Sequence, residues 1–151
     1  MRVRHALAVL TAFAVAAGAL TLTSSAQDQS EKVEGIFNRI EDARGTNLWE
    51  SVRELEDLGR SALDDIRKGQ AKADPYVRIA VGKVLYANDF RDESFDILNK
   101  VMTGKNQTAR RTAAELTASL VAVDKKLKPA DKRKAADAIR KLIDEQEDDL
   151  A

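Results

Sequence analysis

Apolar residues recur at helical spacing along most of this chain. Near its beginning, Val33, Ile36, Phe37 and Ile40 lie at positions i, i+3, i+4 and i+7, which is the spacing of one face of an α-helix. Comparable stripes follow within residues 48–58, 62–66, 77–85, 94–102, 109–120 and 135–143. No stretch alternates convincingly with the period of two that is typical of a half-buried strand. The pattern therefore predicts an all-α protein whose short loops make consecutive helices antiparallel neighbours.

Polar and special residues mark where several of these helices begin and end. Asp74 can accept hydrogen bonds from the N–H groups of a first helical turn, and Pro75 suits the first helical position. We therefore expect Asp74 and Pro75 to form a structural cap for the helix that follows them. Gly59 is expected to stop or bend the chain, and Gly69 is expected to be the C-terminal cap of the helix before it.

One segment is repeated 32 residues later in the chain. The sequence ADPYVRIAVGKVL, residues 73–85, aligns with KNQTARRTAAELT, residues 105–117. The alignment places Arg78 over Arg110, and in the preceding helix it places Ile66 over Leu98. Two helices that share one offset indicate a repeated helix pair, in which each pair buries its apolar face against the next.

These two units resemble the HEAT-repeat family in its short bacterial form. The resemblance rests on LGRSALDDIRKGQAKADPYVRIAVGKVL and on RDESFDILNKVMTGKNQTARRTAAELTASL. The Asp-x-x-Val-Arg pattern of that family is matched by Asp74, Val77 and Arg78, whereas only Arg110 matches it in the second unit. The resemblance implies a short right-handed α-solenoid of antiparallel helix pairs. It also implies that the first helix of each pair lines the convex side and the second lines the concave side.

The resemblance and the pattern divide the chain into four parts. We expect a signal peptide over residues 1–26, a leading or capping helix over residues 27–46 and HEAT-like repeats over residues 47–126. A basic capping helix with an acidic tail is expected over residues 127–151. The two outer helices are expected to act as caps, because the terminal members of a repeat array cover the core from both ends.

The first 26 residues have the composition of a secretory signal peptide. Arg2 and Arg4 precede an apolar run over residues 6–22, and small residues end the segment at Ala26. We expect cleavage after Ala26 and a secreted or periplasmic protein. The alternative is an uncleaved anchor, since this 17-residue run comes near the length that crosses a bilayer, and the chain would then contact the membrane through this segment only.

The composition after cleavage restricts the chemistry. Removal of Arg2, Arg4 and the only histidine, His5, leaves 23 basic and 25 acidic residues, a net charge of −2, and no cysteine. A chain without His and Cys lacks the side chains for a Ser-His-Asp site, a Cys-His site or an imidazole or thiolate zinc site. We therefore expect no catalytic residue, no cofactor and no metal. The near-neutral charge argues against nucleic-acid binding, which requires a strongly basic face.

Four residues are our candidates for partner binding: Tyr76, Arg78, Arg110 and Arg111. Tyr76, at the beginning of a helix, is expected to be exposed and is the first choice. Arg78 and Arg110 could form a carboxylate-binding pair on the concave face. In the alternative interpretation each arginine secures its own interhelical turn, with Arg78 reaching Asp74 one helical turn away.

Other aromatic residues could extend such a binding surface. We expect Tyr86, Phe90 and Phe95 to fill gaps between the helix layers. Trp49 is not assigned to such a packing role. The stretch 124–142 holds eight Lys or Arg residues and three Asp residues. This basic stretch could contact an anionic surface or could simply be the solvated face of a capping helix.

These observations favour an exported, non-enzymatic helical-repeat scaffold that acts by protein–protein interaction. Two alternatives stay open. The first, implied by the resemblance, is the amino-terminal accessory region of an exported enzyme such as a peptidase, truncated or split from its catalytic part. The second is binding of an anionic lipid or cell-wall polymer through residues 125–141. The sequence identifies neither a partner nor an oligomeric state.

Overall fold

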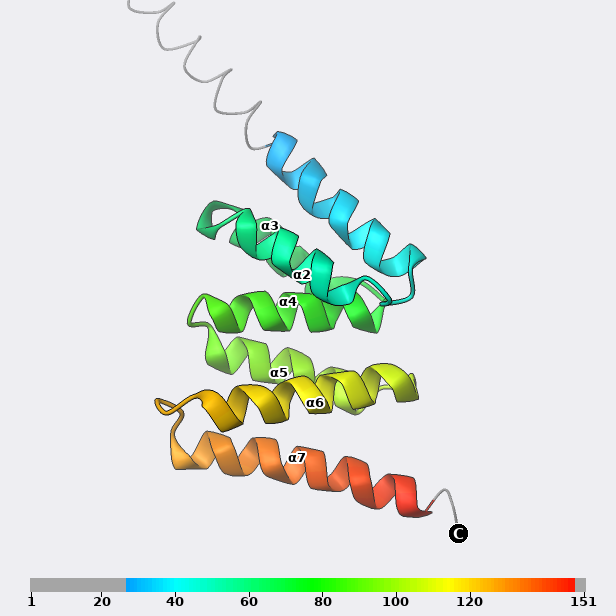
Figure 1. Cartoon of the computed structure of the whole chain (residues 1–151), viewed down its shortest axis with the longest axis vertical. Helices are drawn as coiled ribbons and strands as arrows, with labels where there is room; N and C mark the ends of the chain where they lie inside the picture. The colour runs from blue at the N-terminus through cyan, green and yellow to red at the C-terminus, as the bar shows by residue number, and fades with distance from the viewer. Residues whose placement is uncertain (1–26, 149–151) are drawn as a thin grey trace, which may run out of the picture.

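The computed structural model describes residues 27–148, and all regular structure in this range is helical (Figure 1). A helix over residues 27–42 is followed by α2 (Leu48–Asp57), the 3₁₀ turn η1 (Arg60–Ala62), α3 (Leu63–Lys68), the 3₁₀ turn η2 (Gly69–Ala71), α4 (Pro75–Ala87), α5 (Arg91–Met102), α6 (Gln107–Val123) and α7 (Pro129–Asp148). The predicted all-α class is confirmed for these residues. The expected signal peptide, residues 1–26, lies outside the described range.

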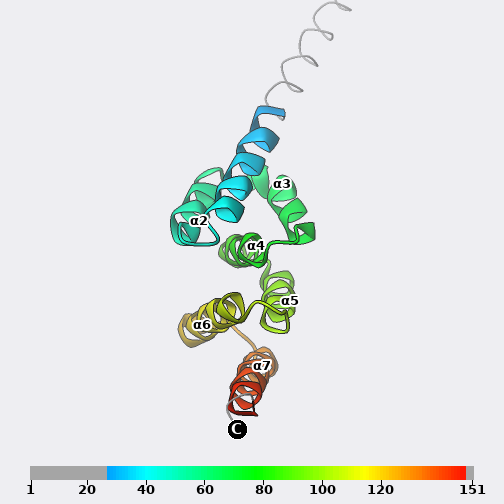
Figure 2. The ribbon, with the colours of Figure 1, turned by 90° about the vertical axis from the view of Figure 1, so that its right-hand side faces the viewer.

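The helices follow the long axis of the molecule from the helix over residues 27–42 to α7, with α2 and α3 side by side at one level (Figures 1 and 2). In the view turned by 90°, α2 and α6 lie on one side and α3 and α5 on the other, with α4 between them (Figure 2). α4 packs against α2, α3, α5 and α6, and α5 packs against α4, α6 and α7. These central helices therefore contact both their neighbours in the sequence and the helices one further along.

α4 is the most completely covered part of this stack. Its predicted stripe is buried, and Ile79 and Gly82 outside that stripe are buried as well. A helix that is apolar around most of its circumference is stable only when other helices surround it. The packing of α4 against helices on several sides supplies this environment.

The chain around Gly69 differs from the prediction. Gly69 has a right-handed φ of −62°, and the chain continues through η2 instead of ending in a glycine cap. A Cβ atom at Gly69 would lie 2.6 Å from Cζ of Phe37 and 2.8 Å from Cγ2 of Val81. Glycine is therefore required here because the helix over residues 27–42 and α4 both pack closely against it. Gly59, by contrast, has a φ of +73° and bends the chain after α2.

α7 closes the stack along a narrow contact strip. Ala135 and Leu142 are buried, as predicted, whereas Ile143 is 51% exposed and does not face the stack. The main packing partners of α7 are α5 and α6, and many residues of the described part of α7 are exposed. None of the helices within residues 27–148 combines the length and the apolar character needed to cross a bilayer.

Candidate functional site

The first turns of α4 and α6 are built in the same way. Oδ1 of Asp74 accepts hydrogen bonds from the backbone N–H groups of Tyr76 (2.8 Å) and Val77 (3.1 Å), and Pro75 is the first residue of α4. Thirty-two residues later, Oδ1 of Asn106 accepts a hydrogen bond from the backbone N–H of Ala109 (3.0 Å). Both side chains satisfy N–H groups that a helix leaves without partners. Asn106 therefore replaces Asp74 with the same structural role.

Arg78 and Arg110 each connect their helix to the turn before it. Nε of Arg78 donates to the carbonyl oxygen of Lys72 at 2.7 Å, and Nε of Arg110 donates to the carbonyl oxygen of Met102 at 2.8 Å. The expected contact between Arg78 and Asp74 is wrong, because the Asp74 carboxylate is occupied by the first turn of α4. Both arginines are partly buried in these turns. The structure therefore shows each arginine securing its own turn.

Tyr76 is less accessible than the sequence predicted. Its side chain is partly buried and packs against the core, so the expectation of an exposed Tyr76 is wrong. A Cβ atom at Gly45 would lie 2.5 Å from Cδ1 of Tyr76, so the ring covers the loop before α2. Arg111, the fourth candidate, has a side chain that is 75% exposed and forms an ion pair with Glu115 at 2.9 Å.

The aromatic residues divide differently from the prediction. Trp49 is 51% exposed and Phe90 is 40% exposed, so Phe90 does not fill a gap between layers as expected. The guanidinium of Arg67 lies 4.2 Å from the centre of the Phe90 ring. Tyr86 and Phe95 are partly buried and meet edge to face, with ring centres 5.7 Å apart, between α4 and α5.

A polar cluster that the sequence analysis missed joins α4, α5 and the end of α6. Oδ2 of Asp124 accepts hydrogen bonds from Tyr86 Oη (2.6 Å) and Arg91 Nε (2.8 Å), while Oδ1 accepts one from the backbone N–H of Lys126 (2.7 Å). These donors hold the pKa of Asp124 well below its usual range. Burial and the bond to Asp124 raise the pKa of Tyr86 to about 12. Near neutral pH, Asp124 is therefore ionised and the Tyr86 hydroxyl keeps its proton. We call the cluster of Tyr86, Arg91 and Asp124 the clasp.

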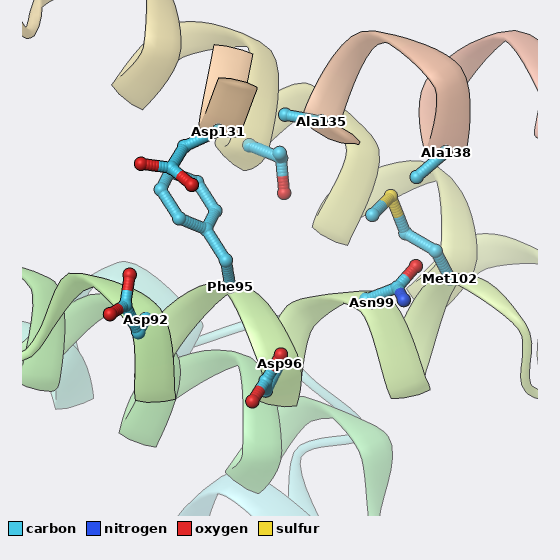
Figure 3. Close-up of a pocket in the computed structure, with 9 residues that line it drawn as sticks. Asp92, Phe95, Asp96, Asn99, Met102, Asp131, Ala135 and Ala138 are labelled. Carbon is cyan, nitrogen blue, oxygen red and sulfur yellow. The ribbon is translucent and has the colours of Figure 1, made fainter. Parts of the chain in front are cut away.

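A pocket of about 500 Å³ opens between α5, α6 and α7 (Figure 3). It is lined by Asp92, Phe95, Asp96, Asn99, Met102, Thr117, Asp131, Ala135 and Ala138. Phe95 rises from α5 toward Asp131 of α7, and Met102 and Ala138 lie together at the other end (Figure 3). Within residues 27–148, Asp92, Asp96 and Asp131 form no ion pair and accept no hydrogen bond. The pocket therefore combines an apolar floor with three unpaired carboxylates.

The residues of α6 explain why space remains beside it. In the 32-residue alignment, Ala113 takes the place of Val81 and Thr117 takes the place of Leu85. Thr117 is buried, lines the pocket and donates its hydroxyl to the carbonyl oxygen of Ala113 at 2.8 Å. Smaller side chains on an otherwise similar helix leave volume unfilled. This difference in side-chain volume is visible in the sequence, but the position of α7, which completes the pocket, is not.

The carboxylates of the pocket do not form a metal centre. In the described range, no group of three or more acidic side chains is arranged so that it could hold a metal ion. Three carboxylates beside apolar side chains suit a ligand that carries both a positive charge and apolar surface. No protein-family model, curated protein or solved structure matches this chain.

Proposed function

We propose that this protein is an exported, non-enzymatic helical-repeat scaffold that binds another protein. The observation that carries the proposal is the repeated device at the beginning of α4 and α6. At each helix a side-chain cap and an arginine four residues after it fix the interhelical turn, 32 residues apart in the two units. Repeated turn chemistry of this kind supports helix pairs that stack on one another and present an extended surface.

The finer fold in this proposal is a short right-handed α-solenoid with HEAT-like units. Its pairs are α3 with α4 and α5 with α6, while the helix over residues 27–42 and α7 act as caps. The contacts of α4 with α2 and α6 and of α5 with α7 support two layers. Arg111 is exposed where the alignment places the buried Ile79, which fits the polar outer face of a terminal repeat.

Binding is favoured over catalysis because the best-placed polar side chains are committed to the stack. General acid–base catalysis is most effective when the pKa of the catalytic group lies near the working pH. The pKa values of Asp124 and Tyr86 are moved away from neutrality in opposite directions, and both groups bond to each other. Arg78 and Arg110 secure turns. These polar side chains therefore stabilise the fold, and we assign binding to the exposed surfaces.

The proposal is tested by affinity capture followed by rebinding of purified partners. The protein is immobilised and exposed to an envelope extract of its source, and a column carrying an unrelated helical protein of similar charge is the control. We expect one protein to be retained specifically and to rebind saturably in calorimetry after purification. Turnover of a substrate by the purified protein that disappears on replacement of one Asp or Lys would contradict the proposal.

One observation favours a second candidate function, which is binding to an anionic surface through residues 125–141. Lys125, Lys126, Lys128, Arg133 and Arg140 are exposed, and none forms an ion pair with an acid of the described range. Cations free of acidic partners can attract anionic lipids, and salt screens this attraction. Vesicles of phosphatidylcholine with and without phosphatidylglycerol test it by co-sedimentation. Binding to neither vesicle type at low salt would remove this candidate.

A further inference from the structure

We propose that the pocket between α5, α6 and α7 binds a basic, amphipathic segment of the partner protein. A Lys or Arg side chain of that segment lies among Asp92, Asp96 and Asp131, and an apolar side chain beside it covers Met102 and Ala138. The inference rests on the proposed scaffold function and adds the chemistry of the surface that is recognised.

The charge of the pocket is the first reason for a cationic occupant. Asp92 and Asp96 lie one helical turn apart on α5, a spacing at which like charges destabilise a helix. Asp92 and Asp131 are in the first turns of their helices, where a negative charge is favourable. Asp96 has no such compensation. It forms no ion pair with Lys100, although Lys100 lies one turn further along the same helix.

The floor of the pocket is the second reason, because it favours a cation with an apolar neighbour. Phe95 presents its ring beside the carboxylates, and a cation over an aromatic face is attracted by the ring (Figure 3). Met102 is flexible and polarizable, so it adapts to different apolar groups. The volume of about 500 Å³ is sufficient for a long side chain and part of a neighbouring one.

The same chain already contains an arginine held in the way that we propose. The guanidinium of Arg67 lies 4.2 Å from the centre of the Phe90 ring, and its Nε donates to Glu93 at 3.2 Å. Phe90 and Glu93 are three residues apart at the beginning of α5. Asp92 and Phe95 bring an acid and a phenyl ring together at the same separation but in the reverse order, and both line the pocket.

A protein segment fits the pocket better than a small free amine does. Asp92 and Asp131 lie on the side of Phe95, whereas Met102 and Ala138 lie together at the other end, with the uncharged amide of Asn99 beside them (Figure 3). A polyamine would satisfy the acidic end and leave the apolar end uncovered. A helix that carries Arg and Leu one turn apart presents both kinds of side chain on one face. We therefore assign the pocket to a basic, amphipathic segment.

The charge is tested with a fluorescent helical peptide that carries Arg and Leu one turn apart, titrated by anisotropy against the full-length protein. The double variant Asp92→Asn and Asp96→Asn is compared with Asp42→Asn and Asp57→Asn, which removes two exposed, unpaired acids elsewhere. We expect the first variant to bind about tenfold more weakly and the second to bind within about twofold of the wild type, since exposed ion pairs contribute modestly each. Equal losses in both variants would overturn the proposal.

The apolar end is tested by filling the pocket. Ala138→Leu places a larger side chain in the pocket, whereas Ala136→Leu places it on the exposed face of the same helix. We expect Ala138→Leu to abolish peptide binding and Ala136→Leu to preserve it, with thermal melting confirming that both variants fold. Unchanged binding by a folded Ala138→Leu variant would overturn the proposal. Binding of spermidine as tight as that of the peptide would show a small-amine site and would also overturn it.

The Asp92→Asn and Asp96→Asn variant is also used as bait in the affinity capture described above. If the wild type and the variant retain the same partner equally, the pocket proposal fails and the scaffold proposal stands. If the wild type retains no partner while the peptide still binds in a pocket-dependent way, the scaffold proposal fails and the binding preference of the pocket stands. Loss of the partner from the variant alone supports both proposals.

Discussion

The helices α4 and α6 share their first turns and differ in what their middle sections bury. Both begin with a capping side chain and an arginine that donates to a backbone carbonyl. The alignment then pairs Val77, Val81 and Leu85 with Ala109, Ala113 and Thr117. Larger side chains are buried on α4, whereas on α6 the smaller Thr117 lines the pocket and Ala109 and Ala113 are fully buried. The comparison shows that two helices with the same first turn can differ in the volume that their middle sections fill.

The two helices also differ in burial at one pair of aligned positions, Ile79 and Arg111. Ile79 of α4 is fully buried, and Arg111 at the equivalent position of α6 is 75% exposed. α4 has α2 and α6 as neighbours, while α6 packs against α4, α5 and α7. A polar residue at this position is therefore tolerated in the second unit because no described helix covers it.

The largest expected effect on stability distinguishes the buried Ile79 from the exposed Arg111. Ile79→Ala removes a fully buried side chain and should reduce the free energy of unfolding by about 2–5 kcal/mol, as buried large-to-small substitutions do. Arg111→Ala changes an exposed side chain and should alter it by less than about 0.5 kcal/mol. Urea unfolding followed by circular dichroism measures both values. Similar losses in the two variants would show that α6 is covered in solution on the face that carries Arg111.

The difference in packing density predicts a second, smaller effect. Gly69→Ala adds one methyl group against Phe37 and Val81 and should destabilise the protein by about 1–3 kcal/mol through overpacking. Ala138→Leu adds more atoms but places them in the pocket, so its cost should stay below about 1 kcal/mol.

Thermal unfolding of both variants tests this difference. Gly35→Ala is the backbone control, since a Cβ atom there has no neighbour within 4 Å. It should stabilise the helix over residues 27–42 by about 0.5–1 kcal/mol. If Gly69→Ala leaves the melting temperature unchanged and Ala138→Leu lowers it, the packing around Gly69 is not tighter than that around Ala138.

The shared first turns predict effects of equal size in the two units. Asp74→Ala and Asn106→Ala each remove a capping oxygen and should each reduce the free energy of unfolding by about 1 kcal/mol. Asp74→Asn should reduce the free energy of unfolding much less than Asp74→Ala does, because Asn106 has the same capping role in the second unit. Chemical denaturation measures the three variants. A loss at Asp74 that is several times the loss at Asn106 would show that the two turns are not equivalent.

The clasp formed by Tyr86, Arg91 and Asp124 predicts an effect of similar size at neutral pH and a distinct pH dependence. Tyr86→Phe removes the bond to Asp124 and should lower the free energy of unfolding by about 1 kcal/mol at pH 7. The pKa of Tyr86 is raised from 10.0 to about 12 in the folded protein, so its stabilisation is present below pH 10 and is lost as the pH rises toward 12. Denaturation curves over this range should fall more steeply for the wild type than for Tyr86→Phe. Parallel curves would contradict the assigned bond.

Local sequence signals predicted the parts of the fold that depend on neighbouring residues. The pair Asp74 and Pro75 indicated the beginning of α4, and α4 begins at Pro75 with Asp74 as its cap. The helical stripes indicated the buried faces, because one periodicity governs both the helix and its covered side. Asn106 could also have been recognised as a cap, since its side-chain oxygen accepts a hydrogen bond from the N–H three residues further on, as that of Asp74 does.

Contacts between distant segments could not be predicted from such local signals. Tyr76 follows Pro75 at the exposed beginning of a helix, yet its ring covers Gly45, which is 31 residues away. Gly69 resembled a cap locally, but the packing of Phe37 and Val81 determines its role. The pocket likewise depends on α7 lying opposite α5, which no periodicity within either helix specifies.

The Nε atoms of Arg78 and Arg110 donate to carbonyl oxygens that carry no charge. The neutrality of these acceptors determines how the two turns respond to pH and salt. A guanidinium keeps its proton throughout the pH range in which proteins fold, and the carbonyl groups of Lys72 and Met102 have none to lose. Salt weakens attraction between exposed charges but acts little on a bond to a neutral carbonyl. We therefore expect the spacing between units to persist in acidic or saline media that loosen surface ion pairs.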